Sequence, residues 1–136
     1  MAKMVLLAEY VAINGTDLSD YAKKAELTTK VEEKDVTTYG SEGWKELLGG
    51  LKSGELALDF LQDFAASALD SIMWPLLGTV VTFEVRPDNA AVGTSNPSYT
   101  GSILINGWNP VSGSVGDEAT VGVSYPTSGA VARATA

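Results

Sequence analysis

The 136-residue chain contains no cysteine and no histidine. Without cysteine it can form neither disulfides nor thiolate zinc sites, and without histidine it lacks the commonest general base and metal ligand. Catalytic arrangements that pair serine or cysteine with histidine are therefore excluded. The chain also lacks a Gly-rich loop ending in Gly-Lys-Ser or Gly-Lys-Thr, the motif that cradles phosphate groups. We expect no enzymatic activity, no cofactor and no metal site.

Basic side chains are scarce as well. The chain carries 9 Lys and Arg against 17 Asp and Glu, which gives a formal net charge of -8 at pH 7. Proteins that bind nucleic acid depend on clustered Lys and Arg to contact phosphates. This composition therefore argues against a surface that holds DNA or RNA.

Long apolar runs are also absent. The longest, residues 72–83, is interrupted by Pro75 and Gly78 and is shorter than the roughly 20 residues of a membrane-spanning helix. The apolar N-terminal stretch, residues 4–8, is too short for the hydrophobic region of a signal peptide. We expect a soluble protein with no membrane partner. Its length predicts one domain, residues 1–136, that buries roughly 70% of its unfolded surface.

Residues 54–61 form a pattern with a period of two. Leu56, Leu58 and Phe60 alternate with polar residues that include Glu55 and Asp59. Alternation of this kind is typical of a strand with one buried and one solvated face.

A helical pattern follows directly and predicts the one helix of the chain. Asp63 stands where an N-cap belongs, Pro75 should force Trp74 out of the helical region, and Gly78 should end the helix. Its apolar stripe comprises Ala65, Ala68, Leu69, Ile72, Met73 and Leu76. We expect Leu69, Ile72 and Met73 to lie in the core. A lone helix must bury its stripe against a sheet, so the chain should be mainly β with one flanking helix.

Further strands are predicted at residues 10–13, 79–86, 99–109 and 118–125, and Asn14-Gly15 predicts a tight turn. Two interpretations compete for residues 21–36. A helix is possible at residues 21–27, but Leu27, Thr29 and Val31 alternate with polar residues, which favours a strand. The acidic run at residues 32–35 would then point to both faces of the strand and could not converge on a metal.

Three segments show no regular period: residues 1–9, 34–50 and 126–136. We expect them to form an N-terminal arm, a long loop and a C-terminal arm. The loop contains apolar residues that could contact another subunit, namely Tyr39, Trp44, Leu47 and Leu48. Two interpretations of Trp44 remain open, since it could pack on its own core or dock on a neighbour.

The C-terminal third of the chain resembles a known family. Residues 108–117 (WNPVSGSVGD), 119–121 (ATV) and 125–129 (YPTSG) are similar to the C-terminal part of the major tail proteins, or tail tube proteins, of long-tailed bacteriophages. The order of the elements is similar too. The resemblance implies a β-sandwich or barrel-like domain with one flanking helix, a long loop and extended terminal arms. It also implies a structural virion protein that assembles into stacked hexameric rings.

In that family the inner sheets close into a barrel around a channel through which DNA passes during ejection without specific binding. The resemblance implies residence in the virion tail, after synthesis in the host cytoplasm, and contact with tape-measure, tail terminator and distal tail proteins. An acidic channel would not retain DNA. The candidate channel-lining residues are Glu26, Lys30, Glu32, Glu55, Asp59 and Glu118. The alternative is a free-standing immunoglobulin-like or adhesin-like binding module, which would not self-associate.

Overall fold

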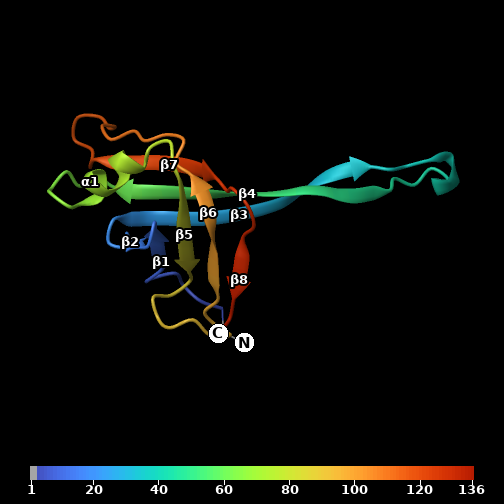
Figure 1. The fold of residues 1–136 in the computed structure, drawn as a ribbon, viewed down its shortest axis with the longest axis horizontal. Helices are drawn as coiled ribbons and strands as arrows, with labels where there is room; N and C mark the ends of the chain where they lie inside the picture. Colours follow the sequence, from blue (N-terminus) through green and yellow to red (C-terminus); the bar gives the residue numbers. More distant parts are fainter. Residues whose placement is uncertain (1–2) are drawn as a thin grey trace.

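In the computed structural model, which describes residues 3–136, two antiparallel sheets pack face to face and a long hairpin projects from one end (Figure 1). The first sheet has the order β2-β1-β5-β6-β8, with strands Thr16–Asp17, Tyr10–Ile13, Val80–Arg86, Ser98–Leu104 and Ala132–Ala134. The second has the order β3-β4-β7, with strands Ala22–Asp35, Leu47–Leu61 and Thr120–Pro126. The helical segments are η1 (Tyr39–Ser41), α1 (Leu69–Met73) and η2 (Trp74–Leu76). The predicted mainly β fold with one short α-helix is confirmed.

The core lies between the two sheets and is closed at one end by α1 (Figure 1). Leu56, Leu58 and Phe60 of β4 point into it and are fully buried, as their alternation predicts. Burying each such side chain contributes about 1.5–3 kcal/mol. The hydroxyl of Tyr125 on β7 donates a hydrogen bond of 2.9 Å to the carbonyl oxygen of Gly107. Burial raises the pKa of Tyr125, so this buried phenol stays a neutral donor.

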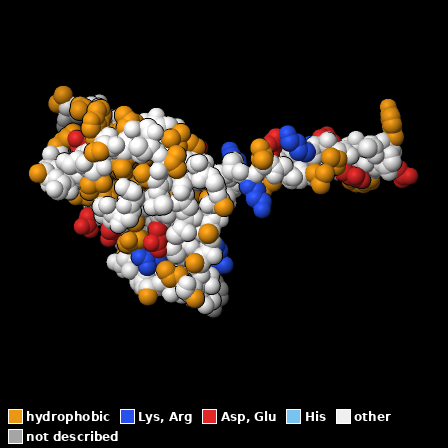
Figure 2. All heavy atoms as spheres, viewed as in Figure 1, with side chains coloured by type: hydrophobic (Ala, Val, Ile, Leu, Met, Phe, Trp, Pro, Cys, Tyr) orange, Lys and Arg blue, Asp and Glu red, His pale blue; other side chains and the backbone are white. Residues whose placement is uncertain are grey.

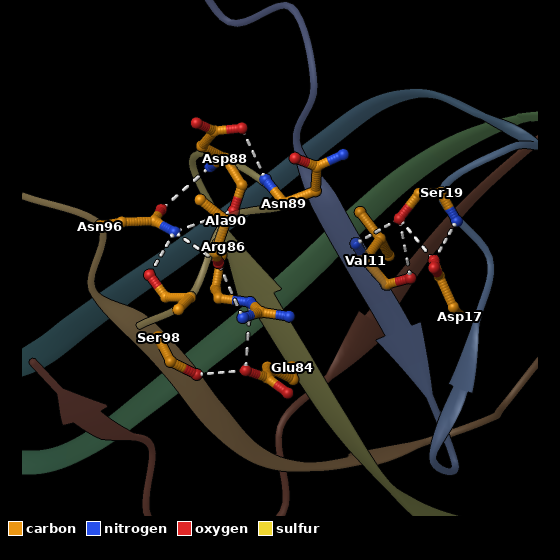
Figure 3. Close-up of polar contacts among 11 residues, drawn as sticks. Val11, Asp17, Ser19, Glu84, Arg86, Asp88, Asn89, Ala90, Asn96 and Ser98 are labelled. Atoms are coloured by element: carbon orange, nitrogen blue, oxygen red, sulfur yellow. Dashed lines mark hydrogen bonds and ion pairs between the residues drawn. The ribbon is translucent and has the colours of Figure 1, made fainter. Parts of the chain in front are cut away.

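The predicted turn at Asn14-Gly15 joins β1 to β2, and both residues have positive φ, at 55° and 77°. Two positive φ angles are typical of a type I′ hairpin turn. Ser19 then links this hairpin to its neighbours, because its hydroxyl oxygen accepts a 3.0 Å hydrogen bond from the Val11 N–H and its own hydroxyl donates to Asp17 (Figure 3).

The predicted helix is shorter than its sequence pattern, and Asp63 is not its N-cap. The α-helix begins at Leu69 with Ala68 as N-cap, while Asp63 accepts a hydrogen bond from the Ala65 N–H in a preceding turn. The reason is Ser67, whose φ of 62° cannot occur inside an α-helix. Trp74 keeps helical angles and is followed by Pro75 in the first turn of η2, so Pro75 does not displace it.

The helical stripe is therefore only partly formed. Leu69 and Met73 are fully buried, Ile72 is partly buried against the core, and Ala65 is exposed. None of the helical segments within residues 3–136 has the length and apolar character needed to cross a membrane.

The predicted loop at residues 34–50 is wrong in extent. Within residues 21–36 the chain forms a strand, β3, as the favoured interpretation predicted, and β3 and β4 keep pairing up to Lys34 with Leu48 and Asp35 with Leu47. The connection is therefore limited to residues 36–46. The C-terminal arm is also partly regular, since Pro126 ends β7 and β8 pairs with β6. Residues 3–9 contain no strand or helix, and residues 1–2 of the predicted N-terminal arm lie outside the described part.

The loop between β5 and β6 is organised around Asn96 (Figure 3). Its amide nitrogen donates to the carbonyl oxygens of Asp88, Ala90 and Ala91, and its amide oxygen accepts from the Asp88 N–H at 3.0 Å. Arg86 adds a hydrogen bond of 3.0 Å to the Ala90 carbonyl oxygen. These bonds satisfy several backbone groups of the loop that no strand ladder pairs, and a bridge between Gly93 and Asn96 pairs others.

Candidate functional site

One face of the β3-β4-β7 sheet is polar and points away from the core. The strand register sets Lys24, Asp59 and Gly122 side by side, and likewise Glu26, Ala57 and Ser124. Because side chains alternate along a strand, these residues lie opposite the buried Leu56, Leu58 and Phe60. We call this surface the polar sheet face; it comprises Lys24, Glu26, Thr28, Lys30, Ser53, Glu55, Ala57, Asp59, Gly122 and Ser124.

Hydrogen bonds and close contacts link the strands across the polar sheet face. The Ser124 hydroxyl donates to the Glu55 carboxylate across β7 and β4. The carboxylate of Asp59 lies over Gly122, where a Cβ would come within 3.1 Å of the Asp59 Oδ1. Glycine at this position therefore leaves room for a charged side chain above the sheet.

Four of the six predicted channel-lining residues share this face: Glu26, Lys30, Glu55 and Asp59. Sequence reasoning missed Lys24, whose ammonium nitrogen lies 3.7 Å from a Glu26 carboxylate oxygen. The signal was available, because Lys24 has the same strand parity as Glu26 and Lys30. The face thus carries three carboxylates and two ammonium groups, a smaller acidic excess than that of the whole chain.

The other two predicted residues have no partner in the strand ladders that define this face. Glu32 belongs to the projecting hairpin, lies at the register shift between Val31 and Glu33, and forms an ion pair with Lys34. Glu118 precedes β7 and lies 3.2 Å from the Lys23 ammonium. Hydrogen bonds from its own backbone N–H and from Lys23 lower the pKa of Glu118. Its charge is therefore already paired within the subunit.

The two strands β3 and β4 continue past the sandwich as a two-stranded projection (Figure 1). We call residues 31–51 the arm, and residues 36–46 the arm tip. Figure 2 shows the arm as a narrow extension with apolar side chains exposed among charged ones. The exposed apolar residues of the arm are Val31, Val36, Tyr39, Trp44, Leu47, Leu48 and Leu51.

Trp44 does not pack on its own core, because its side chain is 79% exposed at the arm tip. The tip nevertheless has a defined conformation. The Glu46 N–H donates a 2.8 Å hydrogen bond to the Thr37 hydroxyl, and the Thr37 N–H donates to Asp35 at 2.9 Å. Hydrogen bonds from the Thr37 hydroxyl and N–H lower the pKa of Asp35. The tip therefore presents Tyr39 and Trp44 on an ordered turn.

The β3-β4-β7 sheet has two open edges, and the described side chains form no metal site. In the β3-β4-β7 sheet, β3 and β7 are the outer strands and have no further strand partner within residues 3–136. Unpaired edges of this kind can extend a sheet into a neighbouring chain. Over the same residues, no group of three Asp, Glu, His or Cys side chains could hold a metal ion.

No protein-family model and no curated protein matches the chain. The fold is similar to that of a chain in "Virion of native gene transfer agent (GTA) particle", with a TM-score of 0.66 and 24% identity over 83% of this chain and 84% of that chain. It is also similar to a chain in "Tail of empty GTA particle computed with helical refinement, C6 symmetry", with a TM-score of 0.64 and 22% identity over 82% and 81%. At these identities the similarity establishes a shared fold.

Proposed function

We propose that this chain is the structural subunit of the tube of a phage-like tail, and that it assembles into hexameric rings that stack on one another. The observation that carries the proposal is the arm, which exposes seven large apolar side chains that no other part of residues 3–136 covers. Exposed apolar surface of this kind marks a protein contact. The neighbouring folds come from a virion and from a tail with C6 symmetry, which supports a ring of six.

Ring closure follows from the two unpaired edges of the β3-β4-β7 sheet. If β3 of one subunit pairs with β7 of the next, the contact is heterologous, and rotation about an axis closes it into a ring. A closed barrel removes every sheet edge. The polar sheet face then lines the channel, because the opposite face of the same sheet is buried in the core.

The channel in this arrangement carries little net charge. Each subunit contributes three carboxylates and two ammonium groups, so a ring of six would carry a modest acidic excess. The ion pair of Lys24 with Glu26 occupies one of the two cations. Each Lys that is free to neutralise a phosphate would add affinity for DNA, so a channel built in this way lets DNA pass without holding it.

In this role the chain acts as a structural component of the virion tail and has no catalytic role. It would be made in the host cytoplasm and would then contact other tail components, including tape-measure, tail terminator and distal tail proteins. Most of its contacts, however, would be with further copies of itself.

Self-assembly of the purified chain is the test of this proposal. We expect size-exclusion chromatography to show species far larger than 14.2 kDa, and negative-stain microscopy to show rings or tubes with sixfold symmetry. An immunoglobulin-like or adhesin-like binding module would instead remain a monomer. A monodisperse monomer at high concentration, over a range of salt concentrations, would contradict the proposal.

The charge of the polar sheet face gives a second expected result. Changing Glu55 and Asp59 together to Lys leaves one carboxylate and four ammonium groups on this face. We expect the resulting tubes to bind double-stranded DNA at about 50 mM salt and to release it as salt rises, because phosphate binding weakens steeply with salt. The measurement is retention of labelled DNA by pelleted tubes. The double change of Asp20 and Asp117, both exposed off this face, to Lys is the matched control. Equal retention by both variants would show that the face does not line the channel.

A further inference from the structure

A hollow of about 460 Å³ lies where the arm joins the sandwich. On one side it is bounded by Thr29, Lys30 and Val31 of β3 with Lys52 of β4, and on the other by residues 127–133. We call it the arm-base pocket. Its volume lies in the range of roughly 300–1,000 Å³ that holds small ligands. The pocket is therefore large enough to receive the indole ring of a tryptophan.

The walls of the arm-base pocket are apolar with a cationic rim. Val31, Tyr99 and Val131 supply apolar surface. The charged residues that form this rim are Lys52 and Arg133, and no acidic residue lines the pocket; Lys30 borders it from β3, but its side chain belongs to the polar sheet face. Figure 2 shows Lys and Arg side chains gathered where the arm leaves the sandwich. The Nε of Arg133 donates a 3.3 Å hydrogen bond to the Tyr99 hydroxyl, which holds one of these cations beside an aromatic wall.

The arm tip has complementary chemistry. It exposes two aromatic side chains, Tyr39 and Trp44, on an ordered turn. Its charges are those of Glu42, Lys45 and Glu46, so carboxylates outnumber ammonium groups. An aromatic anchor flanked by carboxylates fits an apolar pocket with a basic rim.

We propose that the arm-base pocket binds the arm tip of a second copy of this chain, with Trp44 as the anchor residue. The tip cannot reach the pocket of its own chain, because the strand from Thr29 to Asp35 already carries it about 20 Å away. A tip-to-base contact is heterologous and leaves a free tip and a free base at the two ends. The same contact can therefore be repeated from one copy to the next, which joins successive rings. This inference rests on the proposed function.

Disulfide trapping tests the contact between the arm tip and the arm-base pocket directly, since the chain has no cysteine of its own. The variant Lys45→Cys with Ala132→Cys places one thiol beside Trp44 and the other on the pocket wall. We expect mild oxidation of assembled tubes to produce a ladder of covalent oligomers on non-reducing gels. The matched control is Lys45→Cys with Val115→Cys, whose second position is fully exposed and outside the pocket, and it should give no ladder.

A charge exchange provides the second measurement. Lys52→Glu with Arg133→Glu should raise the concentration needed for tube assembly at least about tenfold, because it sets carboxylates against carboxylates. Adding Glu42→Lys and Glu46→Lys to that variant should restore assembly. In the disulfide experiment, the tubes could form normally and yet give a ladder only with the Val115→Cys pair, or with neither pair. Either result would contradict binding of the arm tip in the arm-base pocket and would leave the proposed function standing. If the unmodified chain forms no tubes, the proposed function fails and this inference fails with it.

Discussion

Leu69→Ala is expected to lower the free energy of unfolding by about 2–5 kcal/mol. Leu69 is fully buried at the start of α1, where the helix closes one end of the sandwich. Truncation to Ala removes apolar contacts and leaves a cavity, because α1 is held on both sides by the turns that flank it and cannot move freely into the gap. The measurement is urea unfolding of the monomer followed by circular dichroism.

Two further variants provide comparisons for the loss of unfolding free energy expected from Leu69→Ala. Ile72→Ala should cost less than Leu69→Ala, because Ile72 is only partly buried. Ser71→Ala lies on the exposed side of the same helix and should change stability by no more than about 0.5 kcal/mol. If Leu69→Ala and Ser71→Ala had the same unfolding midpoint, α1 would not cover the core.

The strands of the sandwich could be predicted because each has a buried and a solvated side. In β4 and β7 the alternation of apolar with polar residues follows the pleat of the strand, and the structure preserves it at Leu58, Asp59 and Val121. The helix was predicted too long for a local reason. Apolar spacing across Ala65 and Leu69 looks helical, but the positive φ of Ser67 breaks the segment between them, and spacing alone contains no information about that angle.

The arm could not be recognised as a hairpin because it has no buried side. Strand prediction depends on alternation, and alternation arises only where one face packs on a core. Gly49 and Gly50 also look like loop residues, although Gly49 lies opposite Glu33 in the ladder and a Cβ there would come within 3.1 Å of Val31. Tyr39, Trp44, Leu47 and Leu48 of the same segment, the candidates for contact with another subunit, are all exposed, and the contact itself stays a prediction.

Strand parity can predict part of a site, as the polar sheet face shows. Glu26, Lys30, Glu55 and Asp59 share a face because each lies an even number of residues from its neighbours on the same strand. Glu118 precedes β7, which begins at Thr120, so strand parity does not determine where its side chain lies. Strand ends depend on the pairing between distant segments, so they are the part of the pattern that local sequence determines least.

Trp44→Ala is expected to abolish tube formation at concentrations where the unmodified chain assembles fully. Trp44 is the largest exposed apolar side chain on the arm tip, and buried Trp residues at protein interfaces contribute about 2 kcal/mol or more each. A loss of that size raises the concentration needed for assembly at least about 30-fold. The contact recurs once per subunit, so every ring is affected. Negative-stain microscopy and sedimentation across a concentration series provide the measurement.

The same variant should leave the monomer intact, which separates an assembly defect from a folding defect. Trp44 lies outside the core, at the far end of the arm, so its removal should change the unfolding midpoint by no more than about 0.5 kcal/mol in free energy. Val115→Ala is the matched control, because Val115 is also fully exposed but lies in the loop before β7. We expect that variant to assemble normally. Normal tubes from Trp44→Ala would remove the arm tip from the assembly contacts, and the exposed aromatic residues of the arm would then need another explanation.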